Sequence, residues 1–379
     1  MSTSLDCYRL HDVNRLSTPT LLMYADMIDA NIDAALRMMN GDPNRWRPHL
    51  KTAKLGYTMR RMVARGVRNS KCATTLELVA ALDAGMQDVV VAFPVMGVNA
   101  VRVREIAEAH PEARISALVE GPDQVEEWQG SRVGVFVDLN SGMNRTGMPE
   151  DHFEEVRGFI DQVHRAGLEF RGLHHYDGHV HNTDDSGVAA AKEGYARLAA
   201  LVAYLKERGI HVEEVITSGT PAMPHALSFK AFNEADFVHR VSPGTIIYND
   251  RSSLKELPGY GFVPAALVLT TVVSRPLVNR VTCDGGHKAV SADAGVPTCE
   301  AIGWPGLVGL KPSEEHLPLE MTSGEMPSRG DKLYLLPTHV CPTVNNFDQA
   351  VIIREGKVES IEPVTARGRE IFMASAAPR

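Results

Sequence analysis

The chain has 379 residues, enough for two domains or one elaborated domain, and its 44% hydrophobic and 23% charged residues are ordinary for a globular protein. A formal net charge of −8 argues against nucleic acid or a membrane surface as a partner. No apolar run approaches 18 residues, so we expect no transmembrane helix.

The five cysteines are odd in number, widely spaced and without a Cys-x-x-Cys pair. This pattern favours reduced thiols in a cytoplasm over a disulfide framework. The first ten residues, MSTSLDCYRL, have neither a basic region nor an apolar core, so we expect an unprocessed N-terminus.

Short β-rich runs alternate with helical patterns over the first two thirds of the chain. Apolar residues between the runs recur at three- and four-residue spacing, as in helices that cover a sheet. Eight strands, each followed by a crossover, predict a (β/α)8 barrel of the TIM type, with a doubly wound open sheet as the structural alternative. The predicted strands are residues 45–52, 70–75, 88–94, 113–120, 134–140, 168–176, 213–219 and 236–244.

After about residue 258 the pattern changes to strands joined by Gly- and Pro-rich turns, with no convincing helix between most of them. This pattern of strands and turns predicts an all-β module. We therefore predict an α/β barrel domain at 18–257 and a C-terminal β-strand domain at 258–379, with residues 1–17 packed on the β-strand domain.

Polar residues gather where the predicted strands end, which is where barrels carry their chemistry. Lys51 ends the first strand, Arg145 follows the fifth, and Tyr176 ends the sixth. The seventh and eighth strands end in SGTP and SPGT, short turns whose backbone N–H groups could hold a phosphate. A lysine on the first strand facing a phosphate cradle is the arrangement that pyridoxal phosphate requires.

Two lysines compete for this role in the segment RWRPHLKTAK, residues 45–54. Lys51 lies on the predicted strand itself, whereas Lys54 falls beyond it, at the start of a helical pattern. We therefore predict that Lys51 is the reactive amine and that Lys54 is exposed to solvent.

Three motifs in chain order resemble those of fold-type III pyridoxal phosphate enzymes related to D-threonine aldolase and D-serine dehydratase. RPHLKTAK resembles their first-strand motif, DLNSGMNRTGM resembles a strand-five motif shared with alanine racemase, and PTHVCPTVNNFD resembles the metal-binding turn of the aldolases and dehydratases. The resemblance covers about residues 18–368. It implies an alanine racemase-like barrel, pyridoxal phosphate on Lys51 and a homodimer.

The resemblance also implies roles for individual residues. Arg145 matches the arginine that contacts the polar edge of the cofactor ring, and Tyr176 matches a tyrosine of the cofactor site. The residues that match the phosphate cradle are Ser218, Gly219, Thr220, Gly244 and Thr245.

His339 and Cys341 match the pair that binds a divalent metal in the family. Residues i and i+2 on a strand or tight turn point the same way, and imidazole with thiolate suits Zn²⁺. Mn²⁺ and Mg²⁺ are the alternative metals.

Two departures from the family's pattern concern the catalytic base. Ala53 stands where the family has a histidine beside the cofactor lysine, and Asn182 stands where aldolases carry a candidate base histidine. His179 and His181, in the loop DGHVHN, are therefore the candidate catalytic bases.

The resemblance implies a metal-dependent lyase on β-hydroxy-D-amino acids. Aldol cleavage would give glycine and an aldehyde, whereas elimination, as in D-serine or D-threo-3-hydroxyaspartate dehydratase, would give a keto acid and ammonia. The wider context of the HVCPTVNNFD segment favours the aldolase, which is our leading prediction, and the His-x-Cys pair favours the dehydratase. An amino-acid racemase has no use for the metal pair, and non-catalytic pyridoxal phosphate-binding proteins usually consist of the barrel alone, so both are less favoured.

Overall fold

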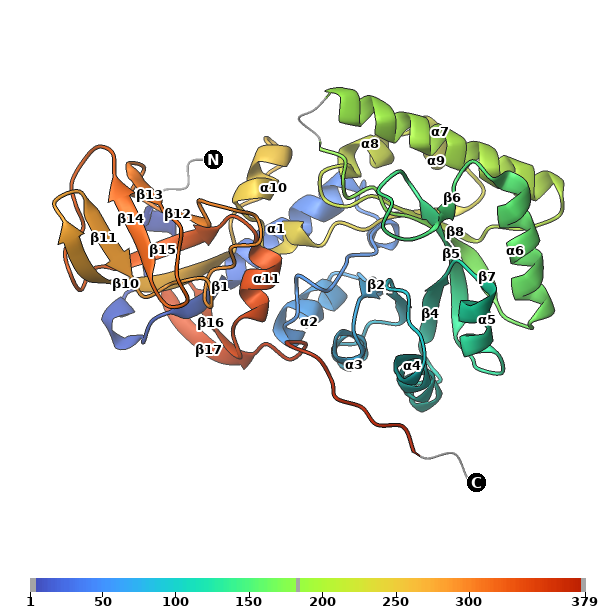
Figure 1. Cartoon of the computed structure of the whole chain (residues 1–379), viewed down its shortest axis with the longest axis horizontal. Helices are drawn as coiled ribbons and strands as arrows, with labels where there is room; N and C mark the ends of the chain where they lie inside the picture. Colours follow the sequence, from blue (N-terminus) through green and yellow to red (C-terminus); the bar gives the residue numbers. More distant parts are fainter. Residues whose placement is uncertain (1–4, 182–184, 376–379) are drawn as a thin grey trace. The chain divides into compact units, whose positions relative to one another are not determined.

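The computed structural model describes residues 5–181 and 185–375, and the chain divides into two compact units (Figure 1). The first unit holds the chain up to residue 35, residues 52–58 and residues 245–367. The second holds residues 36–51, residues 59–244 and the chain from residue 368 onward. The chain thus passes between the units several times, whereas the sequence predicted a single boundary near residue 257.

The second unit is built on parallel strands that follow one another in chain order. Its sheet runs β2–β3–β4–β5–β7–β8–β9, and β6 pairs with β5 alone. The strands are β2 Asn69–Cys72, β3 Asp88–Val91, β4 Arg114–Val119, β5 Gly134–Asn140, β6 Met148–Pro149, β7 Phe170–His175, β8 Glu214–Thr217 and β9 Val238–Val241.

Helices alternate with these strands, as the predicted crossovers require. They are α2 Gly56–Ala64, α3 Thr75–Asp83, α4 Val98–Ala109, α5 Pro122–Trp128, α6 Phe153–Arg165, α7 Asp185–Glu207, α8 Met223–Ser228 and α9 Lys230–Asn233, with a short η3 at Pro43–Arg45. Most of them connect two strands that are neighbours in the sheet, so each connection is a βαβ crossover (Figure 1).

The barrel closes through the segment that the sequence predicted as its first strand, residues 45–52. Isolated parallel bridges join Trp46 to β9 and His49 to β2, the two ends of the sheet. Because Pro48 has no N–H to donate, a regular ladder is interrupted there and only bridges form. The segment still occupies the eighth position, so the predicted (β/α)8-type fold is confirmed, with a sheet of seven regular strands in sequence order.

Alternate residues of the parallel strands point to one side and form a buried cluster. Val90, Leu118, Phe136 and Ile216 come from β3, β4, β5 and β8, and each is at most 3% exposed. Residues two apart on a strand share a face, so one apolar position from each strand is enough to build this layer.

The first unit is a nine-stranded, mostly antiparallel sheet in the order β11–β14–β13–β12–β15–β10–β1–β16–β17. A further pairing of β10 with β11 closes the strands from β10 to β15 into a ring, so the predicted β-strand domain is a barrel. The strands are β1 Thr20–Tyr24, β10 Ala266–Leu277, β11 Arg280–Cys283, β12 Cys299–Ala301, β13 Leu307–Gly309, β14 Leu317–Met321, β15 Lys332–Pro337, β16 Gln349–Arg354 and β17 Lys357–Pro363.

Short helical segments accompany this sheet. They are η1 Leu5–Cys7, η2 Val13–Arg15, η4 Thr245–Ile247, α10 Arg251–Glu256 and α11 Val340–Asn345, and the longer α1, Ala25–Met38, begins in this unit. The segment that resembles the metal-binding turn contains α11, because β15 ends at Pro337 and the helix begins three residues later, at Val340.

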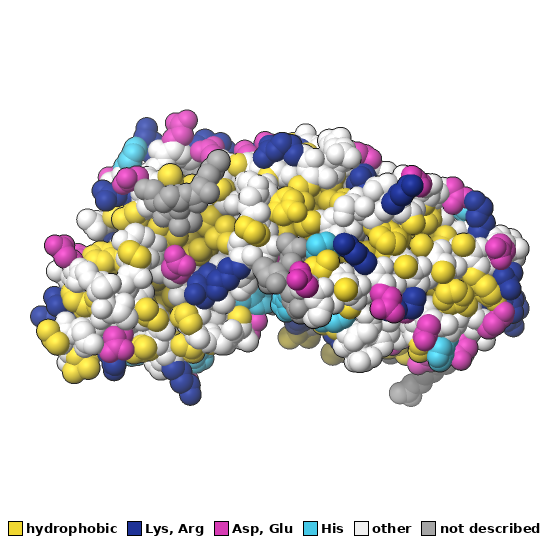
Figure 2. All heavy atoms as spheres, turned by 90° about the horizontal axis from the view of Figure 1, so that it is seen from above, with side chains coloured by type: hydrophobic (Ala, Val, Ile, Leu, Met, Phe, Trp, Pro, Cys, Tyr) yellow, Lys and Arg dark blue, Asp and Glu magenta, His cyan; other side chains and the backbone are white. Residues whose placement is uncertain are grey.

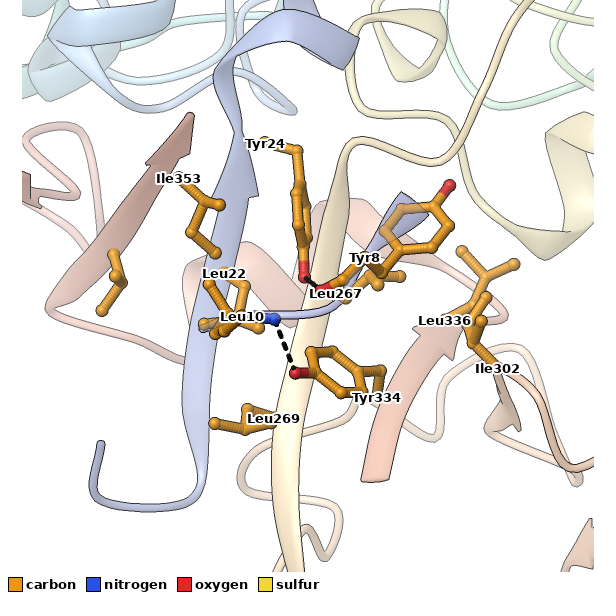
Figure 3. Close-up of a cluster of buried hydrophobic side chains, with 11 residues drawn as sticks. Tyr8, Leu10, Leu22, Tyr24, Leu267, Leu269, Ile302, Tyr334, Leu336 and Ile353 are labelled. Carbon is orange, nitrogen blue, oxygen red and sulfur yellow. Dashed lines mark hydrogen bonds between the residues drawn. The ribbon is translucent and has the colours of Figure 1, made fainter. Parts of the chain in front are cut away.

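A cluster of buried side chains joins the N-terminal segment to the β-sheet of the first unit (Figure 3). The hydroxyl of Tyr24 donates to the carbonyl of Tyr8 at 2.8 Å, and the N–H of Leu10 donates to the hydroxyl of Tyr334 at 3.2 Å. The remaining members are Leu22, Leu267, Leu269, Ile302, Leu336, Val351 and Ile353. Residues far apart in the sequence thus share one core.

The surface carries both signs of charge. On the face drawn in Figure 2, acidic and basic side chains are interspersed over the surface. Within the described part of the chain, no helix is long and apolar enough to cross a membrane.

Candidate active site

A cavity of about 200 Å³ lies in the second unit, where its parallel strands end. Arg145 follows β5 and Tyr176 follows β7, so both reach the cavity from the carboxyl ends of strands, as Lys51 does from the bridging segment. The cavity is lined by His49, Lys51, Lys71, Ala73, Ala92, Phe93, Pro94, Leu118, Arg145, Thr146, His174 and Tyr176. The structure therefore brings together three residues that were predicted from the sequence.

The ring of Tyr176 is surrounded by cationic side chains. The guanidinium carbon of Arg145 lies 5.1 Å from the ring centroid, and the amines of Lys71 and Lys51 lie 5.4 Å and 5.9 Å from it. These distances allow cation–π attraction. None of the lining residues that the structure describes carries a carboxylate, so the cavity suits an anionic ligand.

Two lining residues, Lys71 and His174, were not predicted from the sequence. Lys71 lies on β2 and is 1% exposed, and its amine is 3.0 Å from Nε2 of His174 on β7. Nδ1 of His174 is in turn 2.7 Å from Oδ1 of Asp138 on β5. The sequence signal that could have pointed to Lys71 was its place inside the predicted strand 70–75. The structure buries all four residues of β2, NSKC.

Burial controls the charge of this group of side chains. Burial, followed by the charge of Lys51, lowers the pKa of Lys71 to about 7. Burial and the charge of Lys71 lower the pKa of His174 to about 4, so His174 is neutral at pH 7. Burial of Asp138 acts to raise its pKa, but the charge and hydrogen bond of His174 outweigh it, and the pKa falls below its ordinary value.

The predicted phosphate cradle follows β8 and β9. Ser218 adopts a positive φ of 53°, and its buried hydroxyl has no hydrogen-bond partner among the described residues. The same is true of the hydroxyl of Ser242, and the N–H of Ser242 donates to the carbonyl of Ser218 at 3.1 Å. Two adjacent buried hydroxyls without partners fit a phosphate that would accept from them.

The glycines of the cradle have structural reasons of their own. The N–H of Gly219 already donates to Oδ1 of Asp177 at 3.2 Å, so this predicted phosphate donor is used within the protein. A Cβ on Gly244 would overlap the carbonyl oxygen of His49, so only glycine permits this close approach. Thr220 is buried, with 7% of its surface exposed. Thr245 lies in the first unit, at the start of η4.

The histidines predicted as bases lie in the loop after β7, in which both side chains are exposed. A Cβ built on Gly142 would lie 3.7 Å from Nε2 of His179, so His179 reaches the loop after β5, which also carries Arg145. Asn182, the position of the family's candidate base, is outside the described residues.

The predicted metal ligands lie at the junction of β15 and α11 in the first unit. His339 is the residue before the helix, and its Nδ1 is 2.6 Å from Oδ2 of Asp293. Partial burial lowers the pKa of His339, but the hydrogen bond and charge of Cys341, and then those of Asp293, raise it to about 9. Metal-binding histidines commonly hold a carboxylate on the ring nitrogen away from the metal, and Nδ1 of His339 has this arrangement.

Cys341 is 8% exposed, and two hydroxyls surround its sulfur. Oγ1 of Thr52 lies 2.9 Å from Sγ and Oγ1 of Thr245 lies 3.6 Å from it. No group of three or more His, Cys, Asp or Glu side chains in the described chain is placed to hold a metal. His339 and Cys341 would therefore supply two ligands and leave other positions open.

Lys54 is not exposed, so the prediction from the sequence was wrong. Only 5% of its surface is accessible, and its amine donates to the carbonyl oxygen of Ala366 at 3.0 Å. The residue has a positive φ of 47°, which turns the chain and directs the side chain to the C-terminal segment of the first unit. Its amine is thus a structural donor.

A family model described as "Alanine racemase, N-terminal domain" matches residues 24–252. The chain belongs to this family. A second model, described as a putative serine dehydratase domain, matches residues 265–353. The alanine racemase-like family predicted from the three motifs is confirmed.

Curated relatives align over nearly the whole chain. D-threonine aldolase of an Arthrobacter species is 28% identical over 93% of both chains. A 3-hydroxy-D-aspartate aldolase of Paracoccus denitrificans is 25% identical over 94% of both. D-threo-3-hydroxyaspartate dehydratase of a Delftia species is 22% identical over 92% of this chain and 97% of its own.

Solved structures share the same fold. D-threonine aldolase of Filomicrobium marinum superposes with a TM-score of 0.83 at 27% identity, over 93% of this chain and 96% of the other. A D-threo-3-hydroxyaspartate dehydratase with a cysteine replaced by alanine, in a metal-free form, has a TM-score of 0.75 at 19% identity, over 93% and 98%. Both cover the two units, so the alanine racemase-like fold extends over the chain.

Proposed function

We propose that this protein is a pyridoxal phosphate-dependent lyase that cleaves β-hydroxy-D-amino acids by a retro-aldol reaction, giving glycine and an aldehyde. That it is an enzyme of the lyase class follows from its relatives, which are aldolases and a dehydratase. The observation that best supports the cofactor site is the single cavity in which Lys51, Arg145 and Tyr176 meet at the ends of the parallel strands.

The residues of the second unit fit pyridoxal phosphate. Lys51 would hold the cofactor covalently through its amine, and Arg145 and Tyr176 would pack around the ring. The hydroxyls of Ser218 and Ser242 would donate to the phosphate, since both are buried without a partner among the described residues. When bound, pyridoxal phosphate draws electrons from the α-carbon of an amino acid and so weakens the bonds to that carbon.

The donor set of the first unit fits a divalent metal. We propose that Nε2 of His339 and Sγ of Cys341 bind it, with Asp293 orienting the imidazole through Nδ1. Imidazole with thiolate favours Zn²⁺, and Mn²⁺ or Mg²⁺ are the alternatives. When bound, a divalent metal lowers the pKa of a hydroxyl that it contacts.

The remaining task of the chain is to remove the proton of the β-hydroxyl as the Cα–Cβ bond breaks. We assign it to His179 or His181, because their loop follows β7 directly after Tyr176. Imidazole is the side chain that most often serves as a general base in proton transfer.

Elimination to a keto acid and ammonia is the second candidate. One solved structure of D-threo-3-hydroxyaspartate dehydratase is a variant with a cysteine replaced by alanine, in a metal-free form. In this chain Cys341 belongs to the proposed metal pair, and a His-x-Cys pair favours a dehydratase-like site. The higher identity to D-threonine aldolase, 28% against 22%, favours aldol cleavage.

Product analysis tests both candidates. Purified protein with added pyridoxal phosphate and Zn²⁺ or Mn²⁺ is incubated with D-threonine, D-phenylserine and D-serine. Glycine with acetaldehyde or benzaldehyde supports the aldolase, whereas keto acid with ammonia supports the dehydratase. Racemised amino acid without either product, or no reaction of any D-amino acid, would contradict the lyase.

We further propose a cytoplasmic homodimer. All five cysteines lie in the described chain as free thiols, four of them buried, which suits a reducing compartment. The dimer rests on the family resemblance, and sedimentation of the purified protein tests it.

A further inference from the structure

One peptide unit of the phosphate cradle, between Ser218 and Gly219, is fixed at both of its ends. The carbonyl of Ser218 accepts from the N–H of Ser242 at 3.1 Å, and the N–H of Gly219 donates to Oδ1 of Asp177 at 3.2 Å. Ser218 has a positive φ of 53°, which is uncommon for a residue with a side chain and persists only where the surroundings fix it. The two hydrogen bonds supply that constraint, and one of them comes from a carboxylate.

Asp177 is itself held by a second hydrogen bond. It is 2% exposed, and its other carboxylate oxygen, Oδ2, accepts from the hydroxyl of Tyr195 on α7. Tyr195 is fully buried, and its ring centroid lies 5.4 Å from that of Phe232 and 5.7 Å from that of Phe229. The carboxylate therefore joins the turn after β8 to a helix whose tyrosine is packed in the core.

The turn after β8 also borders the ring of Tyr176, the cavity residue that precedes Asp177 in the chain. A Cβ built on Gly219 would lie 3.3 Å from both Cε2 and Oη of Tyr176, so the turn approaches the ring closely. The hydroxyl of Ser218 is buried and has no partner among the described residues. A rotation of the Ser218–Gly219 peptide would therefore displace the hydroxyl and disturb the ring together.

A carboxylate in this position has two effects that oppose the binding of a phosphate. Its negative charge repels the phosphate, and it occupies the N–H of Gly219, which could otherwise donate to it. Burial raises the pKa of Asp177, because ionisation here costs free energy. If Asp177 had no part in phosphate binding, its removal should therefore leave the affinity for phosphate unchanged or improve it.

We propose instead that Asp177 is a positioning residue of the phosphate cradle. Its carboxylate fixes the Ser218–Gly219 peptide so that the hydroxyl of Ser218 is available to a phosphate monoester, and Tyr195 fixes the carboxylate. The proposal rests on the proposed function in that the phosphate is that of pyridoxal phosphate. Asp177 acts through the turn alone, and no covalent bond forms or breaks at it.

Two forms of the cofactor measure what the phosphate contributes to binding. The full-length chain, freed of cofactor by dialysis, is titrated with pyridoxal phosphate and with pyridoxal, which lacks the phosphate, and visible absorption gives both dissociation constants. Their ratio is the preference for the phosphorylated form. Asp177→Ala should lower this preference by about tenfold or more, because the N–H of Gly219 loses its charged acceptor and the turn is released.

Further variants separate position from charge. Asp177→Asn keeps an oxygen that can accept from Gly219, so it should retain the preference within about twofold. Tyr195→Phe should lower the preference by about fivefold, and should have no further effect in the Asp177→Ala background, since Tyr195 acts through Asp177. Tyr204→Phe is the matched control on the same helix, because it loses a hydrogen bond to the exposed Glu154 and should leave the preference unchanged.

Three results would overturn the proposal. They are an unchanged or higher preference in Asp177→Ala, equal losses in Asp177→Asn and Asp177→Ala, and equal preferences in Tyr195→Phe and Tyr204→Phe. Should Asp177→Ala fail to fold, the two tyrosine variants still decide. The titrations involve no turnover, so a failure of the proposed function shows separately, as absence of product from β-hydroxy-D-amino acids in wild type that binds pyridoxal phosphate.

Discussion

The hydroxyl oxygen of Thr52 lies 2.9 Å from the sulfur of Cys341. Thr52 follows Lys51 directly in the chain, and a second hydroxyl, that of Thr245, lies 3.6 Å from the same sulfur. Hydroxyl donors stabilise a thiolate relative to a thiol, and the thiolate is the form that binds metal. The residue after the proposed cofactor lysine thus supports the proposed metal ligand.

Removal of the metal is the first prediction. We expect EDTA to abolish turnover while the visible absorption of the cofactor and the circular dichroism spectrum stay unchanged, since His339 and Cys341 supply only part of a coordination shell. Zn²⁺ or Mn²⁺ should restore turnover, and Cys341→Asp should shift the preference toward Mn²⁺, a harder ion. Cys7→Ser, a change at an exposed thiol, is the matched control. Full activity with no metal found by elemental analysis would remove the metal from the mechanism.

The cofactor lysine is tested by absorption spectroscopy. Lys51→Ala should lose the visible band of the cofactor after dialysis. Lys54→Ala should keep the band but lower the free energy of unfolding by about 1–3 kcal/mol, because the carbonyl of Ala366 loses its buried donor. A band that disappears only in the Lys54 variant would reverse the assignment.

The two buried serines should respond in opposite ways with and without cofactor. In the cofactor-free protein, Ser218→Ala and Ser242→Ala remove hydroxyls that lack partners among the described residues, so stability should be unchanged or higher. In the loaded protein, each change should weaken pyridoxal phosphate binding by about tenfold, the value of one hydrogen bond to a charged group. Thermal unfolding with and without cofactor measures both effects, and Ser228→Ala, an exposed position, is the control. If Ser218→Ala and Ser242→Ala bound the cofactor as tightly as the control Ser228→Ala, neither serine would be a phosphate ligand.

The loop histidines are tested by kinetics. If one of them is the base, the double variant His179→Ala, His181→Ala should lower kcat by about 10²–10⁴-fold, the usual effect of a positioned acid–base group. Cofactor absorption should stay unchanged. His211→Ala, at an exposed position before β8, should retain activity. Wild-type turnover in the double variant would assign the proton to another group.

Arg47 is expected to be the most sensitive charged residue of the barrel. It is fully buried, and its guanidinium bonds to Glu214 at 2.6 Å and 2.7 Å and to Asp88 at 2.9 Å and 3.1 Å. Arg47→Ala removes the ion-pair partner of buried Asp88 and leaves Glu214 with Arg240, so it should cost about 3–5 kcal/mol of unfolding free energy. Arg45→Ala, which removes a hydrogen bond to Asn233 near the surface, should cost less than about 1 kcal/mol. Similar losses of unfolding free energy in Arg47→Ala and Arg45→Ala would contradict this prediction.

The contact between Arg47 and Asp88 predicts that the stability of the protein depends on pH. Burial acts to raise the pKa of Asp88, but the charge and hydrogen bond of Arg47 outweigh it and lower the pKa from its ordinary 3.8. The stability contributed by this pair is therefore fully present above pH 3.8 and is lost as the pH falls through the lowered value. Acid unfolding measures this, and the free energies of unfolding of wild type and Asp88→Asn should become equal at low pH.

Local pattern in the sequence was sufficient to predict the barrel and part of its site. Alternating strand and helix periodicities are local, and chemistry in such barrels gathers at the carboxyl ends of strands. For that reason Lys51, Arg145 and Tyr176 could be selected one at a time, and the structure places all three in one cavity. The His339–Cys341 pair was selected through its resemblance to the family's metal-binding turn, and its role as a metal site stays a prediction.

Long-range packing decided the rest. Strand β1, only five residues long, pairs with β10 across more than two hundred positions of sequence, so it joins the β-strand unit and not the predicted barrel. Lys54 is buried because a segment near the C-terminus supplies its acceptor. Lys71 lies beside His174 because β2 and β7 face the same cavity, and burial of a lysine has no local signature. A sequence shows which residue types stand at the strand ends, but which of them lose water and meet depends on the folded environment around them.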